Sequence, residues 1–146
     1  MTNKAFAAPL IAWFLAQSIK VVLELVLNRR LDFSRLVSSG GMPSAHSATV
    51  SALATTLGMM QGLGSPLFAI SFIVAGIVLY DSAGVRQSVG QQAVVLNRII
   101  RELRERRPMA ELEHDLRELI GHTPFEVGAG VAIGIGIAVF WVLVIP

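Results

Sequence analysis

The chain has 146 residues, of which 53% are hydrophobic and 15% are charged, and its mean hydropathy is +0.64. This balance excludes an ordinary small soluble domain and predicts a single all-α membrane domain, a helical bundle, over residues 1–146. The absence of cysteine excludes disulfides, thiolate metal sites and a cysteine nucleophile.

The first apolar stretch, residues 5–27, is long enough to cross a hydrocarbon layer about 30 Å thick as a helix. It lacks a convincing small-residue cleavage site, so we expect a retained helix and not a signal peptide. Lys20 and Glu24 lie one helical turn apart within it. They can neutralise each other, but ionisable groups inside a membrane are also candidates for function.

Three further spans are expected, at about 47–63, 66–80 and 125–145, which makes about four in all. The turn between the middle two leaves room only for a tight hairpin. Small residues recur four apart in these spans, a spacing that lets helix backbones approach closely in lipid. The pairs are Ala48 with Ala52, Gly130 with Gly134, and Ala132 with Gly136. Since four spans make a thin bundle, we also expect a homodimer.

Residues 88–120 are too long and too patterned for a plain linker. Val95, Ile99 and Leu103 recur at helical spacing, and leucines do so again beyond Pro108. We therefore expect a cytoplasmic insert of two amphipathic helices. They either pack against each other or a partner subunit, or lie on anionic headgroups.

Lysine and arginine are unevenly distributed, because ten of the twelve lie in residues 29–35 and 86–117. Cytoplasmic loops of membrane proteins retain these residues, so we expect the loops at 28–46 and 81–122 to be cytoplasmic. Both termini and the hairpin turn then lie on the opposite side, where Lys4 departs from the bias. Acidic residues interleaved with the basic ones favour a solvated helical face over a nucleic-acid groove. The expected location is a bacterial inner membrane or an equivalent organelle membrane.

Three polar segments lie at the edges of the apolar spans, and the topology brings all of them to the cytoplasmic end of the bundle. They are Gly40-Gly41-Met42-Pro43-Ser44-Ala45-His46-Ser47, Tyr80-Asp81-Ser82-Ala83-Gly84-Val85-Arg86-Gln87 and Gly121-His122-Thr123-Pro124-Phe125-Glu126-Val127. Two histidines, an arginine and two carboxylates in such a place predict a site that handles a phosphate.

Each polar segment also has a purely structural interpretation. Ser44 or Ser47 can cap the second span, although a helix N-terminus with His46 beside it also suits an anion. Thr123 and Glu126 match a capping box, which leaves His122 unexplained. In the middle segment, Asp81 and Arg86 flank a possible turn at Gly84. Either these two residues form an ion pair, or Arg86 binds phosphate oxygens.

The sequences of these three segments resemble those of the phosphatidic acid phosphatase type 2 superfamily, and more closely those of its small divergent membrane branch. This resemblance extends along essentially the full chain. The resemblance implies that His122 is a nucleophile forming a phosphohistidine, with Glu126 orienting it and His46 acting as general acid. Gly41 and Asp81 would support the site. The phosphate contacts that the resemblance implies are Lys20, Arg29 or Arg30, Ser44 and Arg86.

The chain also departs from the superfamily pattern. Ala45 stands where a glycine is usual, Glu126 replaces an aspartate, and Arg86 is separated from His122 by the whole amphipathic insert. The first motif lacks its proline, and fewer spans are visible than in the lipid phosphatases.

The expected activity is a phosphomonoesterase or phosphotransferase that acts, without metal or other cofactor, on a lipid-linked phosphate at the cytoplasmic leaflet. One alternative is a non-catalytic membrane protein that binds or carries a phosphorylated lipid in the same pocket. Another is a divalent metal held by two histidines and two carboxylates. Its ligands would be His46, Asp81, His122 and Glu126.

Overall fold

The computed structural model describes residues 3–29, 41–85, 92, 94–101 and 122–145. In these ranges the chain forms helices and turns, without a strand, so the expected all-α fold is confirmed. The elements are α1 (Lys4–Asn28), α2 (Ala45–Gln61), α3 (Pro66–Tyr80), the π-helical turn η2 (Asp81–Val85) and α5 (Pro124–Val144).

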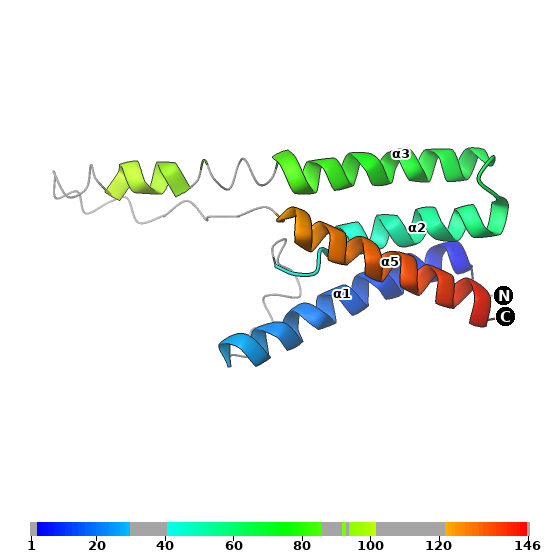
Figure 1. Cartoon of the computed structure of the whole chain (residues 1–146), viewed down its shortest axis with the longest axis horizontal. Helices are drawn as coiled ribbons and strands as arrows, with labels where there is room; N and C mark the ends of the chain where they lie inside the picture. Colours follow the sequence, from blue (N-terminus) through cyan, green and yellow to red (C-terminus); the bar gives the residue numbers. More distant parts are fainter. Residues whose placement is uncertain (1–2, 30–40, 86–91, 93, 102–121, 146) are drawn as a thin grey trace.

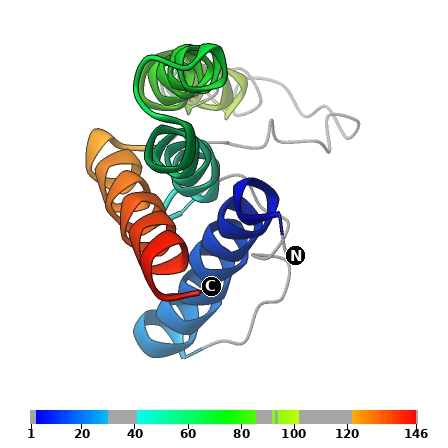
Figure 2. The ribbon, with the colours of Figure 1, turned by 90° about the vertical axis from the view of Figure 1, so that its right-hand side faces the viewer.

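Helix α2 forms the centre of the bundle and contacts α1, α3 and α5 (Figures 1 and 2). Helices α1 and α3 end, and α2 and α5 begin, at the same end of the bundle, which we call the polar end (Figure 1). The opposite end, called the turn end, holds both termini and the Gly62–Ser65 turn between α2 and α3 (Figure 1). The bundle therefore has the alternating topology that the sequence predicts.

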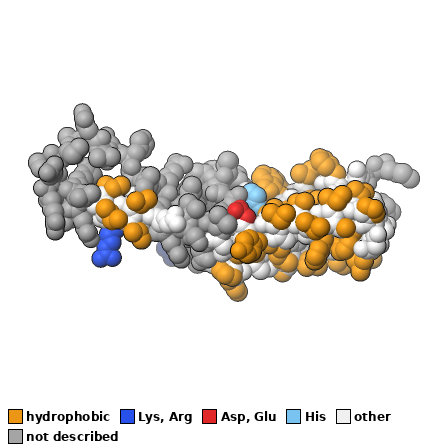
Figure 3. Space-filling view, turned by 90° about the horizontal axis from the view of Figure 1, so that it is seen from above, with side chains coloured by type: hydrophobic (Ala, Val, Ile, Leu, Met, Phe, Trp, Pro, Cys, Tyr) orange, Lys and Arg blue, Asp and Glu red, His pale blue; other side chains and the backbone are white. Residues whose placement is uncertain are grey.

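Three helical segments of the described chain are long and apolar enough to cross a membrane: Lys4–Val26, Pro66–Gly84 and Pro124–Val144. Hydrophobic side chains cover the α3 face of the bundle, with an acidic and a histidine side chain at its polar end (Figure 3). The fourth expected span corresponds to α2, which has 17 residues and more polar side chains. Because the other helices surround α2, it needs less apolar character than a helix exposed to lipid.

Helices α2 and α5 pack with their backbones in close contact. A Cβ atom at Gly130 would lie 2.3 Å from the carbonyl oxygen of Ser44, and one at Gly134 would lie 2.3 Å from that of Ala48. Only glycine fits at either position without a shift of backbone. Two of the predicted small-residue pairs thus meet, whereas Ala132 and Gly136 are exposed.

The buried core between α1, α2 and α5 consists of alanines. They are Ala12, Ala16, Ala45, Ala48, Ala52 and Ala138, with Ile133 and Ile137 packed against them. Small side chains bring the helix axes close together, which in lipid replaces the burial of large apolar side chains as the source of packing energy.

Lys4, the cation that departs from the charge bias, has a structural partner. Its ammonium group donates to the carbonyl oxygens of Val142, at 3.3 Å, and Ile145. These carbonyls belong to the C-terminal turn of α5, where a positive charge is favourable. The lysine therefore links the first helix to the last at the turn end.

The structure tests two predictions for the loop beyond α3. The prediction of a possible turn at Gly84 is wrong, because the chain continues as a helix through η2. Residues 94–101 are helical, as the spacing of Val95 and Ile99 predicts. The remainder of the expected insert, including Leu103 and the second helix, lies outside the described residues.

Replacing either interface glycine by alanine should destabilise the bundle. We expect Gly130→Ala and Gly134→Ala each to lower the free energy of unfolding by about 1–3 kcal/mol, because the new methyl group meets backbone atoms that cannot rotate away. The measurement is the thermal unfolding midpoint of purified protein in detergent.

Gly136→Ala is the matched control, because a Cβ there meets nothing within 4 Å. It should be neutral or stabilising by up to about 1 kcal/mol, from helix propensity alone. Equal midpoints for all three variants would contradict the α2–α5 contact.

Candidate functional site

The first and third polar segments meet at the polar end. The backbone N–H of Ser44, the residue before α2, donates to the carbonyl oxygen of Glu126 in the first turn of α5 at 3.1 Å. This hydrogen bond holds the N-termini of two helices side by side. The positive end of a helix suits an anion, and at α5 the Glu126 carboxylate of the capping box takes this position.

Ser44 is the N-cap of α2, as one interpretation of the sequence predicts. Its hydroxyl oxygen accepts from the backbone N–H of Ser47 at 3.3 Å and from the Ser47 hydroxyl at 2.8 Å. Both serines are fully buried. Gly41, three residues earlier, has a φ of 90°, a conformation that favours glycine. The segment thus enters α2 along a path that depends on its glycine and its serines.

Glu126 completes the predicted capping box of α5. Its carboxylate accepts from the backbone N–H of Thr123 at 2.8 Å, and the Thr123 hydroxyl accepts from the N–H of Glu126 at 3.3 Å. Pro124 occupies the first turn, where its missing N–H costs nothing. Both hydrogen bonds of the capping box are therefore formed, and Glu126 has a complete structural role at the start of α5.

The two histidines differ in their exposure. His122 lies two residues before α5, is 1% exposed and is among the largest fully buried side chains of the described chain. His46, the second residue of α2, is exposed. Of the two imidazoles, only His46 is in direct contact with the surroundings at the polar end.

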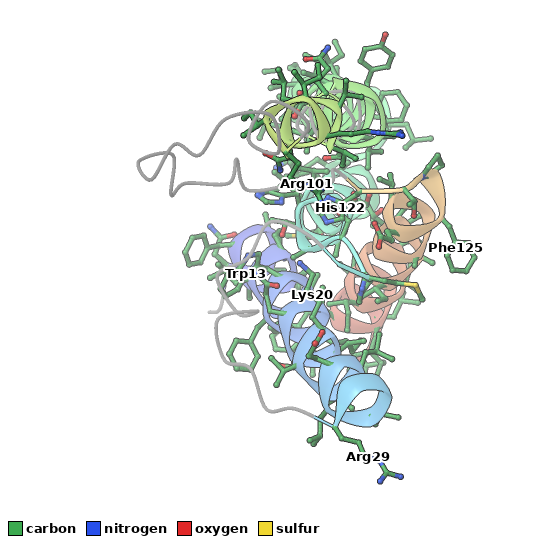
Figure 4. The ribbon with its side chains drawn as sticks, turned by 90° about the vertical axis from the view of Figure 1, so that its left-hand side faces the viewer. Trp13, Lys20, Arg29, Arg101, His122 and Phe125 are labelled. Atoms are coloured by element: carbon green, nitrogen blue, oxygen red, sulfur yellow. The ribbon has the colours of Figure 1, made fainter. Side chains whose placement is uncertain are left out.

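Lys20 lies inside the bundle at the polar end. Ala16 shares a buried cluster with Ala45, the first residue of α2. Lys20 follows Ala16 by one turn on the same face of α1, and it is 5% exposed. Viewed along the bundle from the polar end, Lys20 and His122 both lie near the middle, whereas Arg29 points away from them (Figure 4). The fold therefore brings Lys20, and not Arg29, to the start of α2.

The middle polar segment reaches the same end through η2, which contacts both α3 and α5. Ser82 is 2% exposed and Asp81 is half-buried. A π-helical turn widens the helix by one residue and often marks a functional position. The other two basic candidates, Arg30 and Arg86, lie outside the described residues.

Among the residues that the structure describes, no three histidine or carboxylate side chains gather closely enough to hold a metal ion. The alternative in which His46, Asp81, His122 and Glu126 form a metal site therefore has no geometric support.

Gln17 is a buried polar residue that the sequence interpretation missed. It is 6% exposed, and its amide oxygen has no hydrogen-bond partner among the described residues. Gln17, Lys20 and Glu24 follow each other at helical spacing, so the signal was a polar stripe on the otherwise apolar α1. A buried acceptor of this kind normally has a water or ligand partner.

Chemical modification of histidine should distinguish the two imidazoles. Diethylpyrocarbonate added to the folded protein in detergent should modify His46 much faster than His122, because the reagent needs access to a ring nitrogen and His122 is 1% exposed. Peptide mapping by mass spectrometry separates both sites from His114. Equal rates of modification at His46 and His122 in the folded protein would contradict the burial of His122.

Comparisons with known proteins agree with a membrane protein of one particular family. The divergent PAP2 family matches residues 1–137. An uncharacterized membrane protein of Bacillus subtilis named YuiD is 42% identical over 144 residues, which cover 92% of this chain and 91% of that protein. No solved structure matches the chain. With this match over nearly its whole length, the chain belongs to the divergent PAP2 family.

Proposed function

We propose that the protein is a metal-independent phosphomonoesterase or phosphotransferase that acts on a lipid-linked phosphate at the cytoplasmic leaflet. Family membership supports a phosphate as the group that is handled. The excess of lysine and arginine in the two loops at the polar end supports its cytoplasmic orientation.

The observation that carries the proposal is the hydrogen bond between Ser44 and Glu126, which joins the first turns of α2 and α5. Two helix N-termini then present their positive ends together. Lys20 adds an amine, which carries a positive charge when protonated, on the face of α1 that packs against α2. The positive end of α2 and the amine of Lys20 suit the negative charge of a phosphate monoester, while the Glu126 carboxylate serves the end of α5.

In the proposed reaction, a ring nitrogen of His122 attacks phosphorus and forms an N–P bond as the P–O bond to the lipid breaks. His46 gives a proton to the departing alkoxide, and its exposure lets it exchange protons with water. Water or another acceptor hydroxyl then attacks the phosphorus of the phosphohistidine and loses its proton to His46, while the N–P bond breaks and the imidazole of His122 is released. Lys20 and Arg86 stabilise the charge on the phosphoryl oxygens in both steps.

Removal of the proposed nucleophile should abolish turnover. Purified protein is offered phosphatidic acid or isoprenyl phosphate in the presence of a chelator, and released phosphate is measured. We expect His122→Ala to lower the rate by about 10³-fold or more, because no covalent intermediate can form.

His114→Ala is the matched control and should keep the wild-type rate, since His114 has no role in the proposed reaction. Phosphate release by wild type that does not exceed that of His122→Ala would overturn the enzymatic proposal.

A non-catalytic protein that binds a phosphorylated lipid is the second candidate, and two observations favour it. The carboxylate of Glu126 is already used by the capping box, and His122 is 1% exposed. A buried imidazole and a carboxylate that caps a helix can both stabilise a binding pocket without reacting. Binding of phosphatidic acid that survives His122→Gln, with no turnover by either protein, would select this candidate.

The two roles of Glu126 can be separated by a pair of substitutions. Glu126→Gln retains a capping side chain and should leave the unfolding midpoint nearly unchanged, whereas Glu126→Ala should cost about 1 kcal/mol. If the carboxylate also orients His122, both variants should lose roughly 10²-fold or more in turnover. A fully active Glu126→Gln would restrict Glu126 to the capping role.

A further inference from the structure

A groove with a volume of about 470 Å³ runs between α2, α3 and α5. Its volume is in the range of small-molecule sites. Except for Ser51 and Thr55, its lining is apolar or glycine. It exists because α3 packs on α2 and stands away from α5, as the view along the bundle shows (Figure 2).

The groove runs from Leu63 near the turn end toward the polar end. Near its start, a Cβ at Gly58 would lie only 3.0 Å from the ring of Phe68, so α2 and α3 are in contact there. Toward the polar end the lining reaches Leu79 on α3. At 1.5 Å per residue, the stretch from Phe68 to Leu79 is ~16 Å long. This stretch is most of α3, so the groove follows nearly the whole length of that helix.

The surroundings of the groove are those of a membrane interior. Phe72 and Ile135, on its two rims, are 62% and 44% exposed, and both are apolar. Water in this groove would form few hydrogen bonds, and an empty groove would lose the dispersion contacts of its lining. A hydrocarbon chain needs no hydrogen bonds and restores the dispersion contacts.

The polar end of the groove lies close to the candidate phosphate site. Ser51 lines the groove one helical turn after Ser47, whose hydroxyl donates to Ser44. On α5, the lining residue Val131 follows Gly130, which packs against Ser44. A molecule with an anionic head and an apolar tail can therefore place its head at the N-termini of α2 and α5 and its tail in the groove.

We propose that the groove holds one hydrocarbon chain of the lipid whose phosphate binds at the polar end, an inference that rests on the proposed function. Because the apolar rims of the groove at Phe72 and Ile135 are exposed, the lipid enters sideways from the bilayer, between α3 and α5, and not from the water.

The test uses phosphatidic acid that carries a photoactivatable diazirine in one acyl chain, with the full-length protein in nanodiscs. In wild type, the crosslinks should map to groove residues such as Met59 and Phe72. Gly76→Leu should reduce them by about tenfold, because the new side chain points into the groove and a Cβ at Gly76 meets nothing within 4 Å.

Gly136→Leu is the matched control. It places the same side chain at an equally open glycine on α5 that does not line the groove, so the crosslinks should be unchanged. Unfolding midpoints of both variants report their folding, and the wild-type crosslink map tests the proposal without either of them.

The outcomes separate the two proposals. Groove crosslinks that are equally strong with a diacylglycerol probe, which lacks the phosphate, would support the groove and count against phosphate recognition. Crosslinks spread over the outer faces of α1 and α5, or insensitive to Gly76→Leu, would overturn the groove. Loss of a protein dimer in Gly76→Leu, with lipid labelling unchanged, would assign the groove to a second copy and would also overturn it.

Discussion

The approach of α5 to α2 at Gly130 and Gly134 is the contact on which the rest of the structure depends. Backbone carbonyls of α2 occupy the space that any larger residue would need. Apolar side chains gain little from leaving lipid for protein, so close backbone packing provides the attraction between the helices. The contact extends to the first turns of both helices, where the Ser44 amide reaches the Glu126 carbonyl. The same packing that holds the bundle together therefore assembles its polar end.

The central position of α2 explains how an apolar bundle can contain polar groups. Serines and threonines on α2, such as Ser47 and Thr56, are fully buried by neighbouring helices. Lys20 and Gln17 on α1 face the same interior. Facing lipid, these groups would each cost several kcal/mol, so a helix covered on three sides is where a membrane protein can keep them. Helix α3 contributes little to this core and leaves the groove beside it.

Glu126 illustrates how one side chain can belong to two descriptions of the same site. Its two hydrogen bonds with Thr123 form a complete capping box, and it also stands four residues after His122, where the proposed function requires a carboxylate that orients the histidine. A capping carboxylate fixes the loop that carries His122, so structure and chemistry do not exclude each other. The negative charge of Glu126 distinguishes its capping role from a catalytic role. An amide side chain can also cap the helix, but it does not stabilise a positively charged imidazole.

The sequence by itself determined the helical class, the approximate bounds of the spans and the meeting of the polar segments at one end. Span length and alternating topology depend only on local composition, and the caps at Ser44 and Thr123 depend on neighbours three residues away. The tertiary structure decided that His122 is buried while His46 is exposed, that Arg29 points away while Lys20 points inward, and that Gly130 packs while Gly136 does not. These outcomes depend on which face each helix turns toward its neighbours. Apolar residues lie around the whole circumference of each span, so its hydrophobic pattern does not specify how the helix is rotated about its own axis. Only the close fit between helix backbones selects this rotation.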